Sequence, residues 1–101
     1  MKAGVLGGGA WGTALAQLLG ANGDEVRLWA LEPEVVTAIN ADHVNPLYLP
    51  GLPLSPSIIA TADMADMADC DLLLVVSPAQ HLRAVIAQAP ARVPLVLCSK
   101  G

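Results

Sequence analysis

The chain has 101 residues, of which 54% are hydrophobic and 14% are charged, and its formal net charge is −4. This length suits one domain with its own core and is small for an enzyme that must hold two substrates. The hydrophobic fraction excludes a disordered chain and is typical of a parallel α/β sheet, whose strands are buried on both faces. The acidic balance and the scattered basic residues argue against a nucleic-acid partner.

Targeting, metal and redox signals are weak in this sequence. No apolar run approaches the ~20 residues of a membrane-spanning helix, so we predict no membrane span. Residues 1–6 lack the long apolar region and cleavage site of a signal peptide, so the cytoplasm is the expected location. Cys70 and Cys98 fit no metal or redox spacing. We interpret both as reduced thiols, with Cys98 buried in a strand and Cys70 beside one, and we predict no metal site.

The first part of the chain predicts two strands, each followed by a helix. An apolar run over residues 2–6 predicts a strand that ends at glycines, and residues 11–19 then predict a helix. The apolar side chains that share one face of this helix are Trp11, Leu15, Leu18 and Leu19. Residues 25–31 predict the second strand, and Pro33 opens the second helix. The apolar side of that helix consists of Val35, Val36 and Ile39.

A proline-rich segment over residues 43–57 separates this part from the next elements. We expect it to be an ordered loop, because four of its side chains are apolar and need a surface to cover. These side chains are Leu47, Tyr48, Leu49 and Leu52.

The remaining elements continue the alternation of strands and helices. We predict strands over residues 58–60, 72–76 and 93–98, and helices over residues 63–68 and 80–88. Asp63 is the expected N-cap of the first of these helices. The inward side chains of the second are Leu82, Val85 and Ile86. This alternation predicts a doubly wound parallel α/β sheet with helices on both faces, joined by right-handed crossovers.

A glycine fingerprint stands where the first strand meets the first helix. Gly7-x-Gly9-x-x-Gly12 has the spacing that binds a dinucleotide in this context. We predict that Gly7 permits the tight turn, that Gly9 lets the pyrophosphate approach the backbone, and that Gly12 lets the helix pack closely. The N–H groups of the first helical turn then form an anion site without a basic side chain. The alternative is a glycine turn that binds nothing.

Glu32 follows Gly12 by twenty residues, at the end of the second predicted strand. An acid at this point accepts hydrogen bonds from the adenosine ribose hydroxyls and repels a 2′-phosphate. The alternative is a solvated acid that caps the helix beginning at Pro33.

Four segments resemble bacterial glycerol-3-phosphate dehydrogenases. Residues 7–16 (GGGAWGTALA) resemble the glycine-rich signature of that family, and residues 26–30 (VRLWA), 45–51 (NPLYLPG) and 99–101 (SKG) agree with it in order and spacing. The resemblance implies a Rossmann-type sheet with strand order 3-2-1-4-5. It also implies an oxidoreductase that interconverts dihydroxyacetone phosphate and glycerol 3-phosphate with NAD or NADP and supplies phospholipid synthesis.

The same resemblance implies roles for individual residues. Trp11 would contact the cofactor just inside the first helix, Tyr48 would line the site from the proline-rich loop, and Pro78 would lie near the nicotinamide half. Lys100 would lie between the nicotinamide and the substrate phosphate and so bind both cofactor and substrate. The alternatives are a packing role for Trp11, a loop anchor for Tyr48 and a solvated lysine at position 100.

Two departures from the family pattern bear on the cofactor. The family often has Ser where this chain has Ala10, and many members have Arg or His at the positions of Leu31 and Glu32, where a basic residue grips the 2′-phosphate of NADP. Since neither residue here is basic, we predict NAD as the preferred cofactor, with NADP as the alternative. His43 and His81 are interpreted as solvated side chains without a catalytic role.

The family places its catalytic base in a helical C-terminal domain. We therefore expect residues 1–101 to be a dinucleotide-binding domain that lacks the substrate domain and has no catalytic residue of its own. The expected partners are the dinucleotide and, in the full-length enzyme, glycerol 3-phosphate or dihydroxyacetone phosphate, and a homodimer is a candidate assembly. The alternatives are another Rossmann dehydrogenase, a flavoprotein domain and a nucleotide-sensing module without catalysis.

Overall fold

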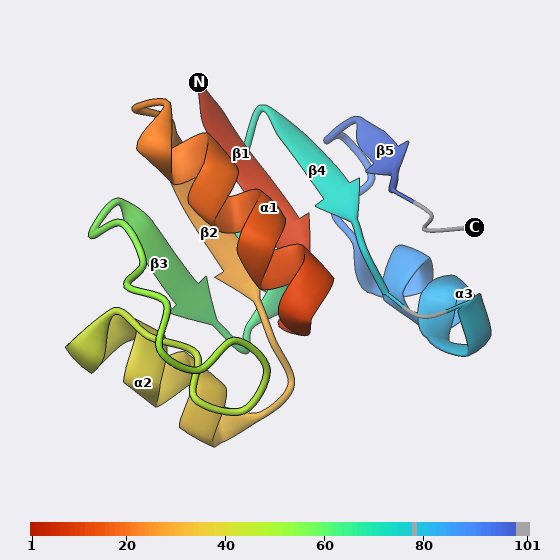
Figure 1. Ribbon diagram of the computed structural model, residues 1–101. Coiled ribbons are helices and arrows are strands. Elements are labelled where there is room, and N and C mark those ends of the chain that lie inside the picture. Colours follow the sequence, from red (N-terminus) through yellow and green to blue (C-terminus); the bar gives the residue numbers. More distant parts are fainter. Residues whose placement is uncertain (78, 99–101) are drawn as a thin grey trace.

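The computed structural model describes residues 1–77 and 79–98 (Figure 1). These residues form a five-stranded parallel sheet in the order β3-β2-β1-β4-β5. The strands are β1 (Lys2–Leu6), β2 (Glu25–Trp29), β3 (Ile58–Thr61), β4 (Leu72–Val75) and β5 (Leu95–Leu97). The helices are α1 (Ala10–Ala21), α2 (Pro33–Asp42), the 3₁₀ helix η1 (Met64–Met67) and α3 (Ala79–Gln88). The predicted strand order, that of the first half of a Rossmann fold, is therefore confirmed.

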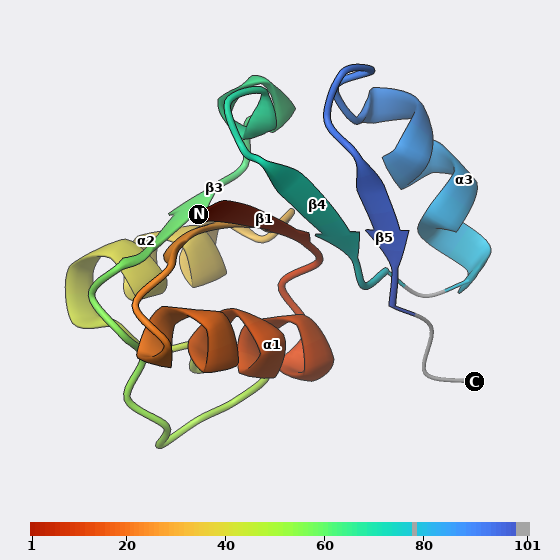
Figure 2. The same ribbon diagram turned by 90° about the horizontal axis from the view of Figure 1, so that it is seen from above.

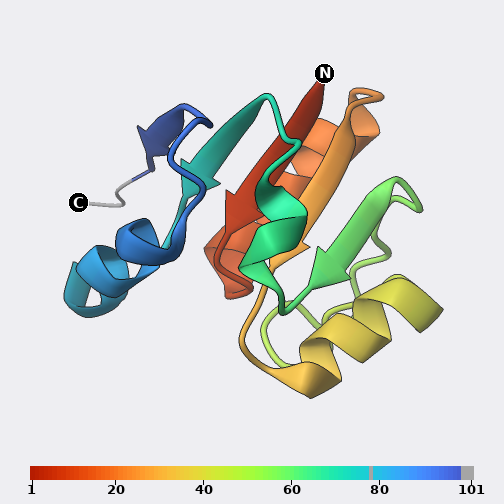
Figure 3. The ribbon, with the colours of Figure 1, turned by 180° about the vertical axis from the view of Figure 1, so that it is seen from behind.

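Different helices cover the two faces of the sheet. Seen from above, α1 lies on one side, with η1 and α3 on the other (Figure 2), and η1 lies over the sheet in the view from behind (Figure 3). The core on the α1 side includes Val5, Ala16, Leu28, Val35 and Ile39. The core on the other side includes Leu6, Met67, Leu73 and Val85. Val5 and Leu6 are neighbours in β1 and serve opposite faces because side chains alternate along a strand.

Helix α1 packs on the sheet through its smallest residues. Its buried residues are Gly12, Thr13, Ala16 and Gly20. By contrast, Trp11 is 44% exposed and Leu18 is 62% exposed. Of the apolar face expected from the sequence, Leu19 packs partly buried against the core, whereas Trp11 and Leu18 point away from it. The fully buried face is therefore formed by the small residues rather than by the expected large ones. The reason is steric, because a Cβ at Gly12 would overlap the carbonyl oxygen of Gly7, so the helix lies too close to the β1 end for large side chains.

The strands at the right of Figure 1 are shorter than the sequence predicted. Strand β4 ends at Val75, and β5 spans three residues that are all exposed. Cys98 lies one residue beyond β5 and is half-buried, so the expectation of a buried thiol inside a strand was wrong. The cause is the position of β5 at the edge of the described sheet, where β4 is its partner. Cys70 is a buried free thiol beside β4, as predicted.

The loop over residues 43–57 is ordered, but not through burial of the four apolar side chains expected to cover a surface. Three of these side chains are exposed, namely Leu47, Tyr48 and Leu52. The loop is held instead by buried Leu54, whose amide donates to the His43 carbonyl at 2.8 Å, and by the fully buried Asn45. No periodic pattern over residues 43–57 indicates which of these positions are buried.

The short helix after β3 is a 3₁₀ turn with the predicted cap. The Asp63 side chain accepts a hydrogen bond from the Ala65 amide at 3.0 Å. Within residues 1–77 and 79–98, no helix has both the length and the apolar composition required to cross a bilayer.

Candidate functional site

The connection between β1 and α1 is a glycine turn, residues 7–9, whose conformation depends on glycine. Gly7 has φ +137°, a backbone conformation that other L residues rarely adopt. A Cβ there would also lie 3.1 Å from the carbonyl oxygen of Val76. At Gly9 the situation is the reverse, because a Cβ would meet no atom within 4 Å. The turn is thus closed on the side of β4 and open at Gly9.

Helix α1 begins directly after this turn and presents its N-terminus to the same open side. Gly9 is the N-cap residue, and no side chain caps the helix. The first N–H groups of a helix have no acceptor within the helix and lie at the positive end of its dipole. A cap made of glycine leaves these groups available to an anionic ligand.

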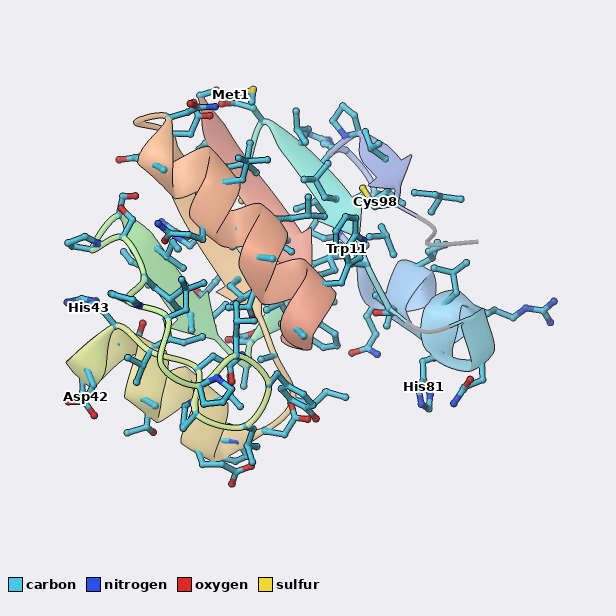
Figure 4. All side chains as sticks on the ribbon, in the orientation of Figure 1. Met1, Trp11, Asp42, His43, His81 and Cys98 are labelled. Atoms are coloured by element: carbon cyan, nitrogen blue, oxygen red, sulfur yellow. The ribbon has the colours of Figure 1, made fainter. Side chains whose placement is uncertain are left out.

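The open side of the turn faces a cleft of about 730 Å³, within the range of sites for small molecules and cofactors. The cleft lies at the carboxyl ends of β1 and β4, the point where the strand order reverses and ligands bind in open α/β sheets. Its lining consists of residues 7–12, 29–32, 48, 75–77, 81, 82, 85, 97 and 98. In Figure 4, Trp11 lies on the side of α1 that faces α3, with Cys98 above it.

All of the predicted cofactor-binding residues that the structure describes line this one cleft. They are Gly7, Gly9, Ala10, Trp11, Gly12, Leu31, Glu32 and Tyr48. The two others, Pro78 and Lys100, lie outside the described residues. Sequence reasoning missed the apolar wall of the cleft, which includes Val75, Val85 and Leu97. Val75 and Leu97 stand at the ends of the fourth and fifth strands, and this position was the signal that could have indicated them.

Glu32 and Tyr48 meet at one end of the cleft. The Tyr48 hydroxyl donates a hydrogen bond of 2.5 Å to the Glu32 carboxylate. This bond, together with the negative charge of Glu32, raises the pKa of Tyr48. Glu32 is the N-cap residue of α2, yet its side chain does not cap the helix. The carboxylate therefore faces the loop and the cleft, so the alternative that its side chain serves as a cap was wrong.

The charges around the cleft indicate that an anion bound there would be held by main-chain N–H groups. Among the lining residues that the structure describes there is no Lys or Arg. Arg27, the basic residue nearest to Glu32 in the sequence, donates instead to the Asp66 carbonyl at 2.8 Å and pairs with Asp69 at 3.3 Å. Neither of these acids lines the cleft.

The two histidines differ from each other. His81 is exposed and lines the cleft on α3, where Figure 4 shows it. His43 is half-buried with a left-handed backbone at φ 56°, and its Nδ1 is buried without a hydrogen-bond partner among the described residues. The interpretation of His43 as a solvated side chain was therefore wrong, because its Nδ1 is buried. The left-handed backbone of His43 closes the C-terminus of α2 and turns the chain into the loop. In the described part of the chain, no cluster of His, Cys, Asp and Glu has the arrangement of a metal site.

Asn45 is a polar residue behind the glycine turn that sequence reasoning did not single out. Its Nδ2 donates to the Gly8 carbonyl at 2.9 Å and to the Thr13 hydroxyl at 2.8 Å, and its Oδ1 accepts from the Tyr48 amide at 3.2 Å. Both Asn45 and Thr13 have no exposed surface. Its place at the head of the 45–51 segment was the available signal, but that signal carries no information on its partners.

Comparison with known proteins places the chain among dehydrogenases. The glycerol-3-phosphate dehydrogenase (NAD(P)+) 1 of Sphingopyxis alaskensis is 63% identical over 99 residues, which are 97% of this chain and 30% of that protein. The corresponding Caulobacter vibrioides protein is 60% identical over 104 residues, covering 99% of this chain and 31% of the relative. The chain thus spans about a third of the length of these relatives.

A solved structure and a family model agree with these relatives. The crystal structure of the Coxiella burnetii glycerol-3-phosphate dehydrogenase superposes with a TM-score of 0.86 at 33% identity, covering 99% of this chain and 32% of that one. The model of the NAD-dependent glycerol-3-phosphate dehydrogenase N-terminus matches residues 2–101. The chain therefore belongs to the family of NAD-dependent glycerol-3-phosphate dehydrogenase N-terminal domains.

Proposed function

We propose that this chain binds a nicotinamide dinucleotide and serves as the cofactor domain of an enzyme that interconverts glycerol 3-phosphate and dihydroxyacetone phosphate. The observation that carries the proposal is the glycine turn, which opens the uncapped N-terminus of α1 into a cleft at the carboxyl edge of the sheet. Family membership supports this function over a flavin-binding domain of similar architecture.

In this proposal each part of the cleft binds one part of the cofactor. The main-chain N–H groups around Gly9 and at the start of α1 bind the pyrophosphate, which suits a cleft without a basic lining residue among those described. Glu32 accepts hydrogen bonds from the adenosine ribose, with Tyr48 beside it. Leu31 and Ala10 would contribute non-polar contacts, and Trp11 would pack on the cofactor from the first turn of α1.

The nicotinamide half would run toward the apolar wall formed by Val75, Val85 and Leu97. The nicotinamide ring supplies the hydride acceptor or donor, and an apolar wall excludes the water that would compete in that step. Pro78 and Lys100 are proposed to contact this half of the cofactor, and Lys100 also the substrate phosphate. The base that takes the substrate proton is proposed to lie in the part of the enzyme corresponding to the remaining length of the relatives.

The decisive experiment replaces Gly9 with a larger residue. In Gly9→Val the new side chain points into open space, and the extended backbone at φ −72° and ψ −175° suits valine, so the fold should be kept. The branched side chain would occupy the space where the pyrophosphate approaches the backbone. We expect calorimetry to show NADH binding in the original protein and none in Gly9→Val, with equal circular dichroism spectra.

Gly9→Ala is the matched control, because it adds one carbon at the same position, and it should weaken binding less than valine does. NADH affinity retained in a folded Gly9→Val protein would falsify the assignment of the glycine turn to the cofactor.

A homodimer also stays a prediction, which sedimentation of the full-length enzyme can test.

A further inference from the structure

The glycine turn cannot hold its own shape. Gly7, Gly8 and Gly9 are consecutive, and glycine loses more conformational freedom on ordering than any other residue. A site that binds an anion through main-chain N–H groups needs those groups oriented before the ligand arrives, since ordering them on binding costs affinity. Some other part of the chain must therefore restrain this turn.

The restraint on Gly8 comes from Asn45, which is 37 positions away in the sequence, and from Thr13 in α1. The Gly8 carbonyl oxygen accepts from Asn45 Nδ2 at 2.9 Å and from Thr13 Oγ1 at 3.3 Å. Asn45 Nδ2 also donates to Thr13 Oγ1, so both of its N–H groups are used. With Asn45 and Thr13 fully buried, this is a satisfied polar network in a low-dielectric environment, where hydrogen bonds hold their partners firmly.

Fixing the Gly8 carbonyl also fixes the next amide. In a planar trans peptide the C=O and N–H groups point in opposite directions. Neither Asn45 nor Thr13 lines the cleft, whereas Gly8 and Gly9 do. Holding the Gly8 oxygen toward Asn45 therefore turns the Gly9 N–H away from the network and toward the cleft.

The same side chain supports the other end of the site. Asn45 Oδ1 accepts from the Tyr48 amide at 3.2 Å, and the Tyr48 hydroxyl donates to Glu32. The loop has attachments that do not involve Gly8, because Leu54 is buried in the core and the Ser55 amide donates to Gln17 Oε1 at 2.7 Å. Among the contacts that hold the loop, the one between Asn45 and Gly8 also restrains the turn.

We infer that Asn45 is a positioning residue for dinucleotide binding, which sets the Gly8–Gly9 peptide for the pyrophosphate and ties it to Tyr48 at the ribose end. This inference rests on the proposed function. Asn45 itself would not touch the cofactor, because it lies behind the turn.

The variant Asn45→Asp tests this with little change of shape. The carboxylate can still accept from the Tyr48 amide, but it cannot donate to the Gly8 carbonyl and instead repels it. We expect the dissociation constant for NADH, measured by calorimetry on the folded fraction, to rise about ten-fold, the effect of roughly one buried hydrogen bond.

Asn40→Asp is the matched control. Asn40 Nδ2 donates to the Ala60 carbonyl at 2.9 Å and its Oδ1 accepts from the Ala60 amide at 2.8 Å, so the substitution removes the same kind of bond away from the cleft. It should lower the thermal midpoint without changing the NADH affinity. Equal affinities of folded Asn45→Asp and Asn40→Asp would overturn the inference.

If Asn45→Asp does not fold, Thr13→Val and Thr13→Ser decide the question. Valine matches threonine in shape but removes the hydroxyl that Asn45 and Gly8 share, so it should weaken NADH binding, whereas serine keeps the hydroxyl and should restore it. Equal NADH affinity in the original protein, Thr13→Val and Thr13→Ser would overturn the inference. An original protein that binds no NADH would overturn the proposed function as well, and this outcome differs from a loss confined to the variants.

Discussion

Glu32 and Tyr48 form a contact that joins the end of β2 to the loop over residues 43–57. From the sequence, Glu32 is a candidate ribose ligand or helix cap, and Tyr48 is a candidate cofactor contact or loop anchor. The structure brings the two side chains together at the edge of the cleft. Each therefore constrains the other, and the orientation of the carboxylate depends on a residue of the loop.

Tyr48 is the one tyrosine of the sequence, so its ionisation can be followed directly. Its pKa is raised, first by the hydrogen bond to Glu32 and then by the charge of that residue. A raised folded-state pKa means that the bond contributes to stability at neutral pH and is lost as the pH rises through that value. We expect tyrosinate absorbance to titrate above the usual value of about 10 and to return toward it in Glu32→Gln. Identical titrations of the two proteins would contradict the contact.

Glu32 should also determine which of NADH and NADPH binds more tightly. A 2′-phosphate at this end of the cleft would meet the Glu32 carboxylate, while Arg27 is engaged by Asp66 and Asp69. A like-charge contact in a binding site costs enough to favour NADH over NADPH by at least about ten-fold. Glu32→Gln should narrow that ratio, measured by titration with both reduced cofactors.

Glu34→Gln is the control for this experiment, because Glu34 is an exposed acid in the first turn of α2 and does not line the cleft. Tighter binding of NADPH than of NADH to the original protein would reject the prediction.

Among the elements, α1 shows how the site depends on packing. Its small residues let the helix approach β1 so closely that its first turn lies at the cleft. Two of its large apolar residues, Trp11 and Leu18, are exposed on the outer side. Residue size, rather than hydrophobicity, therefore decides which face of this helix is buried.

This packing predicts opposite responses at two neighbouring positions. Ala16 is fully buried, so Ala16→Leu should overpack the core and lower the free energy of unfolding by about 1–3 kcal/mol. Leu18→Gln, on the exposed side, should change it by no more than about 0.5 kcal/mol. Urea unfolding followed by circular dichroism measures both. A larger loss in Leu18→Gln than in Ala16→Leu would show that the helix packs through its large side chains.

The elements predicted well from sequence were those with a local signal. The glycines at the end of β1, Pro33 at the start of α2 and Asp63 before η1 each mark a boundary through their own backbone chemistry. Contacts between distant residues carry no such signal. Asn45 meets Gly8 across 37 positions, and His43 adopts a left-handed conformation that its neighbours do not indicate.

At the scale of the whole molecule, the cleft lies where the two halves of the sheet meet. The chain runs outward from β1 to β3 on one side and from β4 to β5 on the other, so the carboxyl ends of β1 and β4 leave room between them. The cleft is lined by residues from both halves, and a ligand bound there bridges them.

A ligand that bridges both halves should stabilise the folded chain as a unit. If NADH binds the native state alone, a concentration one hundred times its dissociation constant adds about 2.7 kcal/mol to the free energy of unfolding. For a domain of this size that corresponds to a rise of roughly 10–20 °C in the thermal midpoint. Differential scanning calorimetry should record this rise for the original protein and no rise for Gly9→Val. A similar rise in both proteins would indicate that NADH binds elsewhere.

Since the groups proposed to hold the pyrophosphate belong to the main chain, trimming the side chains that line the cleft one by one leaves them intact. An alanine scan of the lining residues would therefore miss this part of the site, or would damage it only by adding atoms. At Gly12 any added carbon overlaps the Gly7 carbonyl, whereas Gly9 faces open space. In a saturation library of residues 7–12, sorted separately for folded protein and for NADH capture, substitutions at position 12 should disappear from both pools. Those at position 9 should disappear from the second pool alone, the largest side chains first.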